Sequence, residues 1–410
     1  MGKKNIKGIS TIVLHTANHE NDNFSHTTPI YATSTFTFSS ADEGMARFKG
    51  DDKTRLYTRW GNPTFNVAEK TIEALEARGL TNESGAPLEV KALLHSSGQA
   101  AISTLFFSNL SAGDCLISHY SLYGGSQELM QKVLNEAGVK IILIDIHNED
   151  LLLETIKGNP TTKLIHLETP ANPTLQCVDI EAVCKIARAH GIKVSVDNTV
   201  ATPYLQQPFA LGADYVFHSA TKFLNGHGSA LNGVLVGKDL EFMNTKVWKW
   251  HALLGGNSNA FDAYLLIQGM KTLELRMEKH CSNAKKAAEF LSAHDSVEWV
   301  RFPGLEGDPS YELSEKYLNG TGGTMVVFGI KGGKDSGQKF IDNLKMFRHV
   351  ANVGDTRSLA IHPASTTHSQ LDDEALVAAG SPPELVRLSI GIENIEDIIE
   401  DLSQALESTK

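Results

Sequence analysis

Short apolar segments alternate with amphipathic segments over residues 90–237. The apolar segments end in polar or glycine-containing turns, and the segments between them place apolar residues at helical spacing. This alternation is typical of a doubly wound, mostly parallel β-sheet with helices on its faces. The predicted strands lie in VKALLHSS (90–97), CLISHY (115–120), KIILIDI (140–146), TKLIHLET (162–169), IKVSVDN (192–198), ADYVFHS (213–219) and ALNGVLVG (230–237).

The pattern changes on both sides of this region. Residues 1–62 show little periodicity and are predicted to form an arm with one short helix near 41–49. A helix is expected to start at Asn62-Pro63, and residues 63–262 are assigned to the sheet domain. Residues 263–410 combine long helical periodicity, with a possible break at Gly269, and strand-like segments at 297–302, 324–330 and 384–392. This combination indicates a smaller α+β domain.

The composition of the chain indicates which kinds of partner and which cellular compartment to expect. The net charge of −11 argues against nucleic acid or an anionic membrane as the main partner, although a local site for a small anion remains compatible with it. No apolar run is long enough to span a membrane. The start of the chain lacks the apolar region of a signal peptide, and the four cysteines form no CxxC pair. We therefore expect reduced thiols and a cytoplasmic protein.

Chemistry-bearing side chains follow several of the predicted strands. Ligands of open α/β sheets bind outside the carboxyl ends of the strands, so these positions should meet at one rim. Glu168, Asp197 and Lys222 each come at or just after such an end. Gly98 and Gln99 begin a helix directly after a strand, and free backbone N–H groups at such a helix start form an anion site.

Each of these residues also has a simpler interpretation. Lys222 could be a solvated loop residue, and the turn at Gly98 an ordinary strand-to-helix connection. Asp197 could serve as a helix cap or turn residue. Arg387, with apolar neighbours in ELVRLSIGIE, could form an internal salt bridge instead of binding an anionic ligand.

Other chemistries are poorly supported. No GxGxxG or Walker A sequence is present. The histidine pairs His19/His26 and His362/His368 lack recognisable metal-ligand spacing, so no metal is predicted. GNSNA (256–260) only approaches the serine-nucleophile motif.

Pyridoxal phosphate explains the rim residues together. This cofactor needs a lysine amine, an acid at the pyridine nitrogen, and a cup of amides and hydroxyls around its phosphate. Lys222 supplies the amine and Asp197 the acid. The candidate phosphate cup consists of Gly98, Gln99, Ser219 and Thr221.

Five ordered motifs also resemble a known family. They are YTRWGNPT (57–64), SLYGGS (121–126), ETPANPT (168–174), VDNT (196–199) and SATKFLNGHG (219–228). Together they are similar to the pyridoxal-phosphate enzymes of Cys/Met transsulfuration metabolism, over about residues 8–405. The resemblance implies the fold-type I architecture, which has a mostly parallel seven-stranded sheet and a smaller C-terminal α+β domain. It also implies a homotetramer built as a dimer of dimers.

The resemblance assigns roles to individual residues. Lys222 corresponds to the lysine that carries the cofactor and moves protons, and Asp197 to the acid at the ring nitrogen. Tyr123 corresponds to the catalytic-site ring that stacks on the cofactor, and Asn172 to a donor to its 3′-oxygen. Further implied roles are phosphate binding across the subunit boundary by Tyr57 and Arg59, and binding of the substrate carboxylate by Ser358 and Arg387.

Finer features favour one branch of the family. VGDTRSLAIHPASTTHSQL (353–371) and Gln99 resemble the O-acylhomoserine sulfhydrylases, and Gly125 stands where methionine γ-lyases usually carry cysteine. The leading expectation is therefore conversion of O-acetylhomoserine with sulfide, or a thiol, to homocysteine, or methionine, and acetate. The alternatives are methionine γ-lyase or cystathionine γ-synthase-type activity. A non-catalytic phosphate- or nucleotide-binding oligomer is the alternative of another class.

Overall fold

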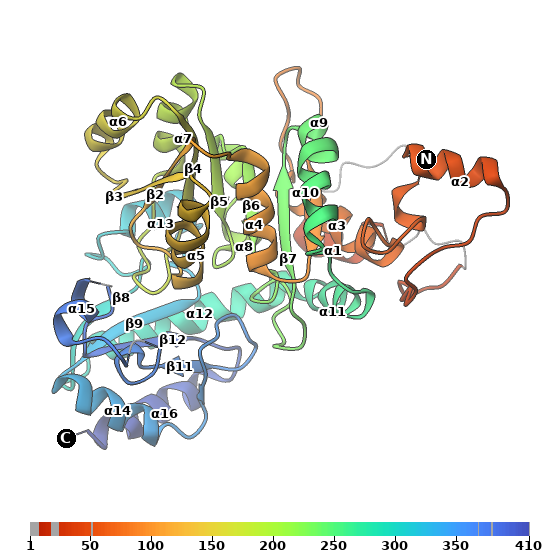
Figure 1. Ribbon diagram of the computed structural model, residues 1–410. Helices are drawn as coiled ribbons and strands as arrows, with labels where there is room; N and C mark the ends of the chain where they lie inside the picture. The colour runs from red at the N-terminus through yellow and green to blue at the C-terminus, as the bar shows by residue number, and fades with distance from the viewer. Residues whose placement is uncertain (1–7, 18–23, 51, 368, 379, 410) are drawn as a thin grey trace.

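The computed structural model describes residues 8–17, 24–50, 52–367, 369–378 and 380–409 (Figure 1). An N-terminal arm leads into a seven-stranded sheet, and a five-stranded sheet follows towards the C-terminus. His19 and His368, which the sequence analysis considered as metal ligands, lie outside the described residues.

The larger sheet is mostly parallel, as the sequence predicts. Its strand order is β1-β7-β6-β5-β4-β2-β3, and only β7 runs antiparallel to its neighbours. The strands are β1 (Lys91–His95), β2 (Cys115–His119), β3 (Lys140–Ile144), β4 (Thr162–Glu168), β5 (Lys193–Asp197), β6 (Tyr215–His218) and β7 (Gly233–Gly237).

The strands of this sheet are buried on both faces. In β1, Leu93 points into one apolar cluster, whereas Ala92 and Leu94 belong to another. Because successive side chains enter different cores, such strands appear in the sequence as continuous apolar runs. The covering helical segments are α3 (Pro63–Glu76), α4 (Gly98–Asn109), α5 (Gly124–Glu128) with a π-helical segment Leu129–Leu134, α6 (Glu149–Gly158), α7 (Ile180–Ala189), α8 (Thr202–Leu205), a 3₁₀ segment Pro208–Leu211, α9 (Leu240–Phe242) with a π-helical segment Met243–Val247, α10 (Trp248–Leu254) and α11 (Ala260–Met270).

The smaller sheet has the order β10-β11-β12-β9-β8 and is antiparallel except between β10 and β11. The predicted strands at 297–302, 324–330 and 384–392 are confirmed, whereas the short strands β10 and β11 were not predicted. The elements of this part are α12 (Leu273–Ser292), β8 (Val297–Arg301), α13 (Tyr311–Tyr317), β9 (Met325–Ile330), α14 (Gly333–Asn343), β10 (Arg348–His349), β11 (Leu359–Ile361), a 3₁₀ segment Pro363–Ser365, α15 (Asp373–Ala378), β12 (Leu385–Ser389) and α16 (Ile395–Glu407).

Helices α11 and α12 connect the two parts of the molecule. α11 packs against α3, and it spans the domain boundary that the sequence analysis placed at residue 262. The predicted break near Gly269 is confirmed, because α11 ends at Met270. A Cβ on Gly269 would lie 2.1 Å from the carbonyl oxygen of Asn225, so glycine lets α11 approach the loop after β6.

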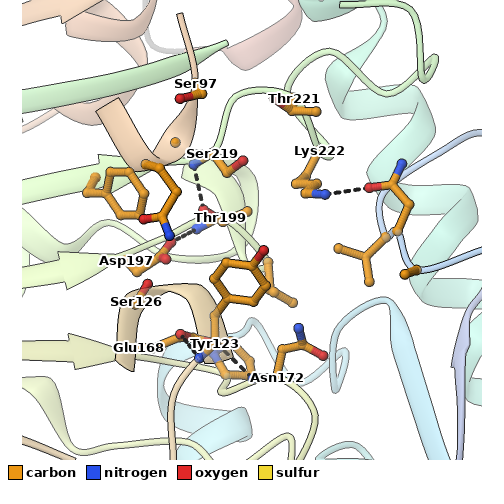
Figure 2. A pocket seen from close by; sticks show the side chains of 18 of the residues that line it. Ser97, Tyr123, Ser126, Glu168, Asn172, Asp197, Thr199, Ser219, Thr221 and Lys222 are labelled. Atoms are coloured by element: carbon orange, nitrogen blue, oxygen red, sulfur yellow. Dashed lines mark hydrogen bonds between the residues drawn. The ribbon is translucent and has the colours of Figure 1, made fainter. Parts of the chain in front are cut away.

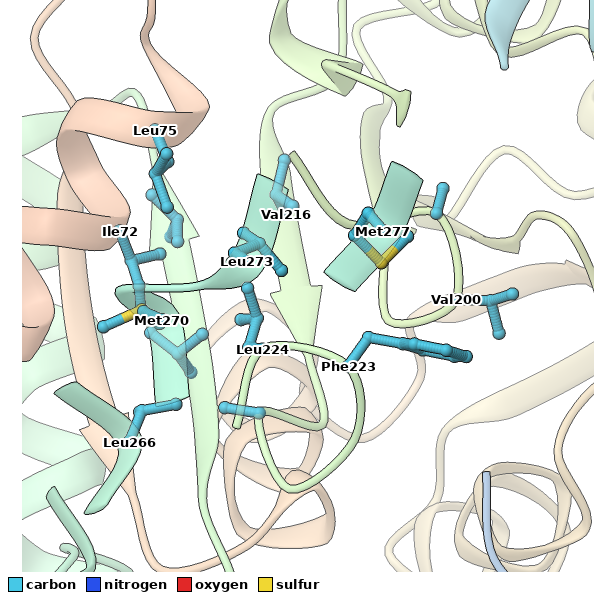
Figure 3. Packing of buried hydrophobic residues seen from close by; sticks show 14 of the residues in the cluster. Ile72, Leu75, Val200, Val216, Phe223, Leu224, Leu266, Met270, Leu273 and Met277 are labelled. Atoms are coloured by element: carbon cyan, nitrogen blue, oxygen red, sulfur yellow. The ribbon is translucent and has the colours of Figure 1, made fainter. Parts of the chain in front are cut away.

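The same apolar cluster anchors the loop that carries Lys222. Phe223 and Leu224 are buried in it beside Ile72 of α3, Met270 of α11 and Met277 of α12 (Figure 3). Two adjacent apolar side chains therefore fix the backbone directly after the lysine.

The arm is less regular than the sheet domain. Its predicted helix α2 (Ala41–Lys49) projects from the body of the molecule at the right of Figure 1. An unpredicted helix α1 (Ile9–His15) packs against α3 and α12 instead, and a 3₁₀ turn forms at Lys53–Arg55. The predicted start of α3 is confirmed, since Asn62 Oδ1 accepts a 2.9 Å hydrogen bond from the Thr64 amide.

The four cysteines are free and buried. Among the described residues, no helix is both long enough and apolar enough to cross a membrane.

Candidate active site

A cavity of about 220 Å³ lies at the carboxyl ends of the parallel strands (Figure 2). It brings together nine of the twelve residues that the sequence analysis proposed for the site. They are Gly98, Gln99, Tyr123, Asn172, Asp197, Ser219, Thr221, Lys222 and Arg387.

Lys222 lies on the short loop after β6, and its amine donates a hydrogen bond to Asn352 Oδ1. Burial, and secondarily the charge of Arg387, lower the pKa of the Lys222 amine. A lysine in this environment is nearer to its neutral, nucleophilic form than a solvated one.

Arg276 of α12 holds the loop after this lysine. Its buried guanidinium donates to the backbone carbonyls of Phe223, Leu224 and Gly269 at 2.7 to 3.2 Å. Burial lowers the pKa of Arg276 to about 10, and no described carboxylate pairs with it. The loop that carries Lys222 is therefore fixed through its backbone as well as its apolar side chains.

Asp197 ends β5 and is buried at the cavity wall. Its Oδ1 accepts a 2.9 Å hydrogen bond from the Thr199 amide, whereas Oδ2 has no hydrogen-bond partner among the described residues. Burial raises the pKa of this carboxyl, and Thr199 and His218 only partly offset that effect. The Oδ2 atom of Asp197 is therefore available to a hydrogen-bond donor of a bound ligand.

A second carboxyl, Glu168, lies beside Asp197 on the neighbouring strand β4. Burial and the Asp197 charge raise its pKa. Glu168 accepts hydrogen bonds from the amides of Tyr123 (2.8 Å) and Asn172 (2.9 Å), so it holds the two loops that carry those residues.

A fully buried pair, Glu76 and His218, lies behind the cavity. Glu76 Oε1 and His218 Nε2 are 2.5 Å apart, and Asn198 also donates to Glu76 Oε1. The electrostatic interaction with His218 lowers the pKa of Asp197 and so offsets part of the effect of burial. The sequence analysis did not identify this pair, because Glu76 belongs to a helix that is distant in the sequence.

The cup for an anion forms where the α4 N-terminus meets the loop after β6. A Cβ on Gly98 would lie 2.9 Å from the Ser219 Cβ, so only glycine allows this approach. Among the described residues, no acceptor meets the amides of Gly98 and Gln99. Thr221 differs from the expectation, because its hydroxyl already donates to the Asn232 carbonyl.

Arg387 enters the cavity from β12. It donates to Asn172 Oδ1 (2.9 Å) and the Asn352 carbonyl (3.1 Å), and its buried Nε has no partner. Burial lowers its pKa to about 10. None of the ion pairs among the described residues includes Arg387, so the structure does not support an internal salt bridge. The guanidinium is arranged to receive an anionic ligand.

The expectation for Ser358 is not supported by its position. Its side chain is fully buried away from the cavity, and its hydroxyl donates to Glu393 Oε2 while accepting from the Gly391 amide. Asn352 lines the cavity instead and contacts both Lys222 and Arg387. The sequence analysis missed Asn352 because it precedes the recognised segment 353–371 and follows no predicted strand.

Tyr57 and Arg59 do not line the cavity of their own chain. Tyr57 is partly exposed on the arm, and Arg59 donates to the Ala252 carbonyl. Their role at a neighbouring subunit therefore stays a prediction.

Comparison with known proteins places this site in a family. The model of the Cys/Met metabolism PLP-dependent enzymes matches residues 10–407. The chain belongs to this family. An L-methionine gamma-lyase from Porphyromonas gingivalis is 43% identical over 98% of this chain and 97% of its own length. An O-acetyl-L-homoserine sulfhydrylase from Leptospira meyeri is 37% identical over 94% of this chain and 93% of its own length.

A solved structure supports the same assignment. The crystal structure of metB from Corynebacterium glutamicum is 38% identical and covers 99% of both chains, with a TM-score of 0.88. The fold-type I architecture and the pyridoxal-phosphate cofactor are thereby confirmed. The expected proximity to the sulfhydrylases is only partly supported, because methionine γ-lyases are the more similar of these relatives.

The cavity fits the family's cofactor on its own geometry. An anion cup at Gly98 and Ser219 suits a phosphate, and the unpartnered Oδ2 of Asp197 suits a protonated ring nitrogen. When bound, pyridoxal phosphate supplies an electron sink for the electron pair left at the Cα of an amino acid. Asp197 would then keep the proton on the ring nitrogen, and Lys222 would move protons at the substrate carbons. Arg387 would orient the substrate carboxylate.

Replacement of Arg387 by alanine should weaken use of any amino-acid substrate. Loss of a charge-assisted bond of about 1.5–3 kcal/mol predicts a fall of roughly 10- to 150-fold in kcat/KM, mainly through KM. Steady-state kinetics on Arg387→Ala would measure this. Arg357→Ala is the matched control, because Arg357 is exposed and pairs with Asp355 outside the cavity. An unchanged KM together with a lower melting temperature would instead assign Arg387 a structural role.

Proposed function

We propose that the protein is a γ-eliminating enzyme that acts on L-methionine. In this reaction the Cγ–S bond breaks, methanethiol leaves, and hydrolysis of the remaining carbon skeleton gives 2-oxobutanoate and ammonia. The observation that carries the proposal is the identity of 41 to 43% to L-methionine gamma-lyases from Porphyromonas gingivalis and Treponema denticola, over nearly the full chain.

The cavity residues can perform the proton transfers that this elimination needs. Removal of one proton from Cα and another from Cβ precedes departure of the sulfur at Cγ. Lys222 is the single lysine among the residues that line the cavity, and its lowered pKa suits a group that alternately accepts and donates protons. Asn352 holds the Lys222 amine, and Arg387 holds the carboxylate end of the substrate.

A second candidate is the sulfhydrylation of O-acetylhomoserine that the sequence analysis favoured. The surroundings of Gly125 favour this candidate. A Cβ at this position would lie 2.6 Å from both Gln99 Nε2 and Tyr123 Cε1. In this chain Gln99 thus occupies the space that a side chain at position 125 would need. The sulfhydrylase of Leptospira meyeri, 37% identical, represents this activity among the relatives.

Product analysis separates the two candidates. Purified enzyme would receive either L-methionine or O-acetylhomoserine, each with and without sulfide, and 2-oxobutanoate, methanethiol and homocysteine would be quantified. We expect methionine alone to give equal amounts of 2-oxobutanoate and methanethiol. Homocysteine from O-acetylhomoserine and sulfide, with no product from methionine, would contradict the lyase proposal and support the sulfhydrylase.

We further infer that the active site is shared between subunits. The projecting arm and the nearby helices leave large apolar side chains exposed, including Met45, Phe48, Leu253 and Phe261. Large contiguous apolar surface of a protein often marks an interface with another chain. An arm covering a second subunit would bring Arg59 to that subunit's anion cup, where its forked guanidinium suits a phosphate.

Mixing two inactive variants tests the shared site. Chains with Lys222→Ala and chains with Arg59→Ala each lack one part of every site in their own homodimers. In a hybrid dimer, one of the two sites contains both native residues, so we expect activity to return after co-refolding, up to roughly half of the native value per hybrid. Hybrids verified by mass spectrometry that remain inactive would place both residues in the same subunit's site.

A further inference from the structure

A cluster of two histidines and an aspartate lies outside the cavity, at the edge of the larger sheet. His119 ends β2, and Asp145 and His147 follow the edge strand β3, which pairs with β2 (Figure 1). One ligand atom from each residue lies within 4.8 Å of the other two. None of the three residues lines the cofactor cavity.

The two imidazoles present the same ring atom, Nδ1, towards the aspartate. In His119 this atom also accepts a long hydrogen bond of 3.3 Å from the Ile146 amide, which a bound ion would replace. His119 Nε2 contacts Gln176 Oε1 at 3.0 Å, and His147 Nε2 contacts the Cys177 carbonyl at 3.0 Å. Both partners accept, so both Nε2 atoms carry the proton in these contacts. Nδ1 of His119 then lies 4.0 Å from Asp145 Oδ1, and Nδ1 of His147 lies 2.9 Å from it.

This pattern is the one that surrounds metal-binding histidines. A ligating histidine usually donates its second ring N–H to a carbonyl or carboxylate, which fixes the tautomer and aims the other nitrogen at the metal. Here adjacent residues of one loop, Gln176 and Cys177, provide both acceptors. Without a metal, His147 faces an acceptor with each ring nitrogen, and a neutral imidazole can donate a hydrogen bond to only one of them.

The charge states also suit a cation. Burial lowers the pKa of His119, whose side chain is fully buried, and so favours the neutral form that can bind a metal. At Asp145 burial acts in the opposite direction, but hydrogen bonds from His147 lower its pKa below the ordinary value and keep the carboxylate ionised. Ligands of a tetrahedral zinc site lie about 3.3–3.5 Å apart, given bonds of about 2.0–2.1 Å, so small side-chain shifts would close this cluster around an ion.

We propose that His119, Asp145 and His147 form a binding site for a divalent transition-metal ion, represented by Zn²⁺, with water completing the coordination. Two imidazoles and one carboxylate suit zinc and similar ions better than Mg²⁺ or Ca²⁺, which prefer oxygen ligands. The site would join the start of the segment that leads to Tyr123 to the loop after β3. The hydrogen bonds of the two imidazoles to Gln176 and Cys177 extend this link to the segment that follows Asn172. It therefore lies where a bound ion could stiffen both loops beside the cofactor.

Calorimetric titration of the chelator-treated holoenzyme with Zn²⁺ tests the proposal. We expect one Zn²⁺ per native chain, and binding weakened at least about tenfold in His147→Ala, because even loss of an outer partner costs 10- to 100-fold. Asp145→Asn should weaken binding in the same way and preserves side-chain shape if His147→Ala folds poorly. The matched control is His294→Ala, since His294 is 3.9 Å from Glu407 but belongs to no group of three candidate ligands among the described residues. Its Zn²⁺ binding should equal that of the native protein.

Two results would overturn the inference. One is a native holoenzyme that binds no Zn²⁺, which would leave Asp145 and His147 as a simple ion pair. The other is unchanged Zn²⁺ affinity and stoichiometry in both His147→Ala and Asp145→Asn, which would place the bound ion elsewhere. Melting curves recorded without Zn²⁺ establish that each variant is folded before titration.

Discussion

Replacing Lys222 by alanine should abolish turnover while leaving the cofactor bound without a covalent link. The expected loss in kcat is at least about 10⁴-fold, the upper end of what one general acid–base group contributes, because this residue also carries the cofactor. Its position supports the prediction. The Lys222 amine is held by Asn352 at the cavity, and its pKa is lowered by burial.

The cofactor attachment can be measured separately from activity. Borohydride reduction and peptide mapping of the native protein should label Lys222. In Lys222→Ala the cofactor should remain, through its phosphate and ring contacts, but dissociate on denaturation. Lys193→Ala serves as the control, because Lys193 lies at the opposite end of β5 and pairs with Asp214 on the surface. Labelling of another lysine, or retained turnover in Lys222→Ala, would disprove the assignment.

Replacement of Asp197 should have the second-largest effect on activity. Loss of the carboxylate removes the group that keeps the ring nitrogen protonated, and electrostatic contributions of this kind are worth about 2.7–4 kcal/mol, or roughly 100- to 1000-fold in kcat. Asp197→Asn keeps the shape of the side chain, and Asp197→Ala removes it. Both variants should lose activity to a similar extent if charge is the determining property.

The same substitutions should not destabilise the cofactor-free fold. Burial raises the folded-state pKa of Asp197, so ionisation is less favourable in the folded chain than in the unfolded one. The cofactor-free native protein should therefore lose stability as pH rises from the ordinary carboxyl range through the raised pKa, and Asp197→Asn should reduce that loss. Melting curves over this pH range measure it. Near-normal turnover in Asp197→Asn would instead mean that the ring nitrogen has another partner.

The sequence predicted the larger sheet well because its strands are uniform. Each strand is buried on both faces, so it appears as a short apolar run, and its polar end marks the rim of the sheet. The sequence did not show that β7 is antiparallel, because β7 has the same apolar pattern as the parallel strands. The direction of a strand in the sheet depends on the segment that connects it to the preceding strand and not on its own composition. The short strands β10 and β11 carry too few residues for a periodic pattern.

The candidate site was predictable where residues follow strands and unpredictable where distant segments meet. Lys222 and Asp197 were found because each lies at a strand end. Asn352 was missed because its contacts with Lys222 and Arg387 depend on how the C-terminal part folds over the sheet. Ser358 was expected at the cavity, but its hydroxyl binds Glu393 instead. This contact could not be predicted, because the two residues become neighbours only in the folded chain.

The guanidinium of Arg276 has a consequence for how the protein acquires its cofactor. Its bonds to three backbone carbonyls and the burial of Phe223 and Leu224 are made entirely within the polypeptide. The segment bearing Lys222 is thus ordered before any ligand arrives, and its conformational entropy is lost during folding and not during binding. Association with pyridoxal phosphate then resembles the docking of a rigid partner, and an emptied protein retains the shape needed to take the cofactor up again.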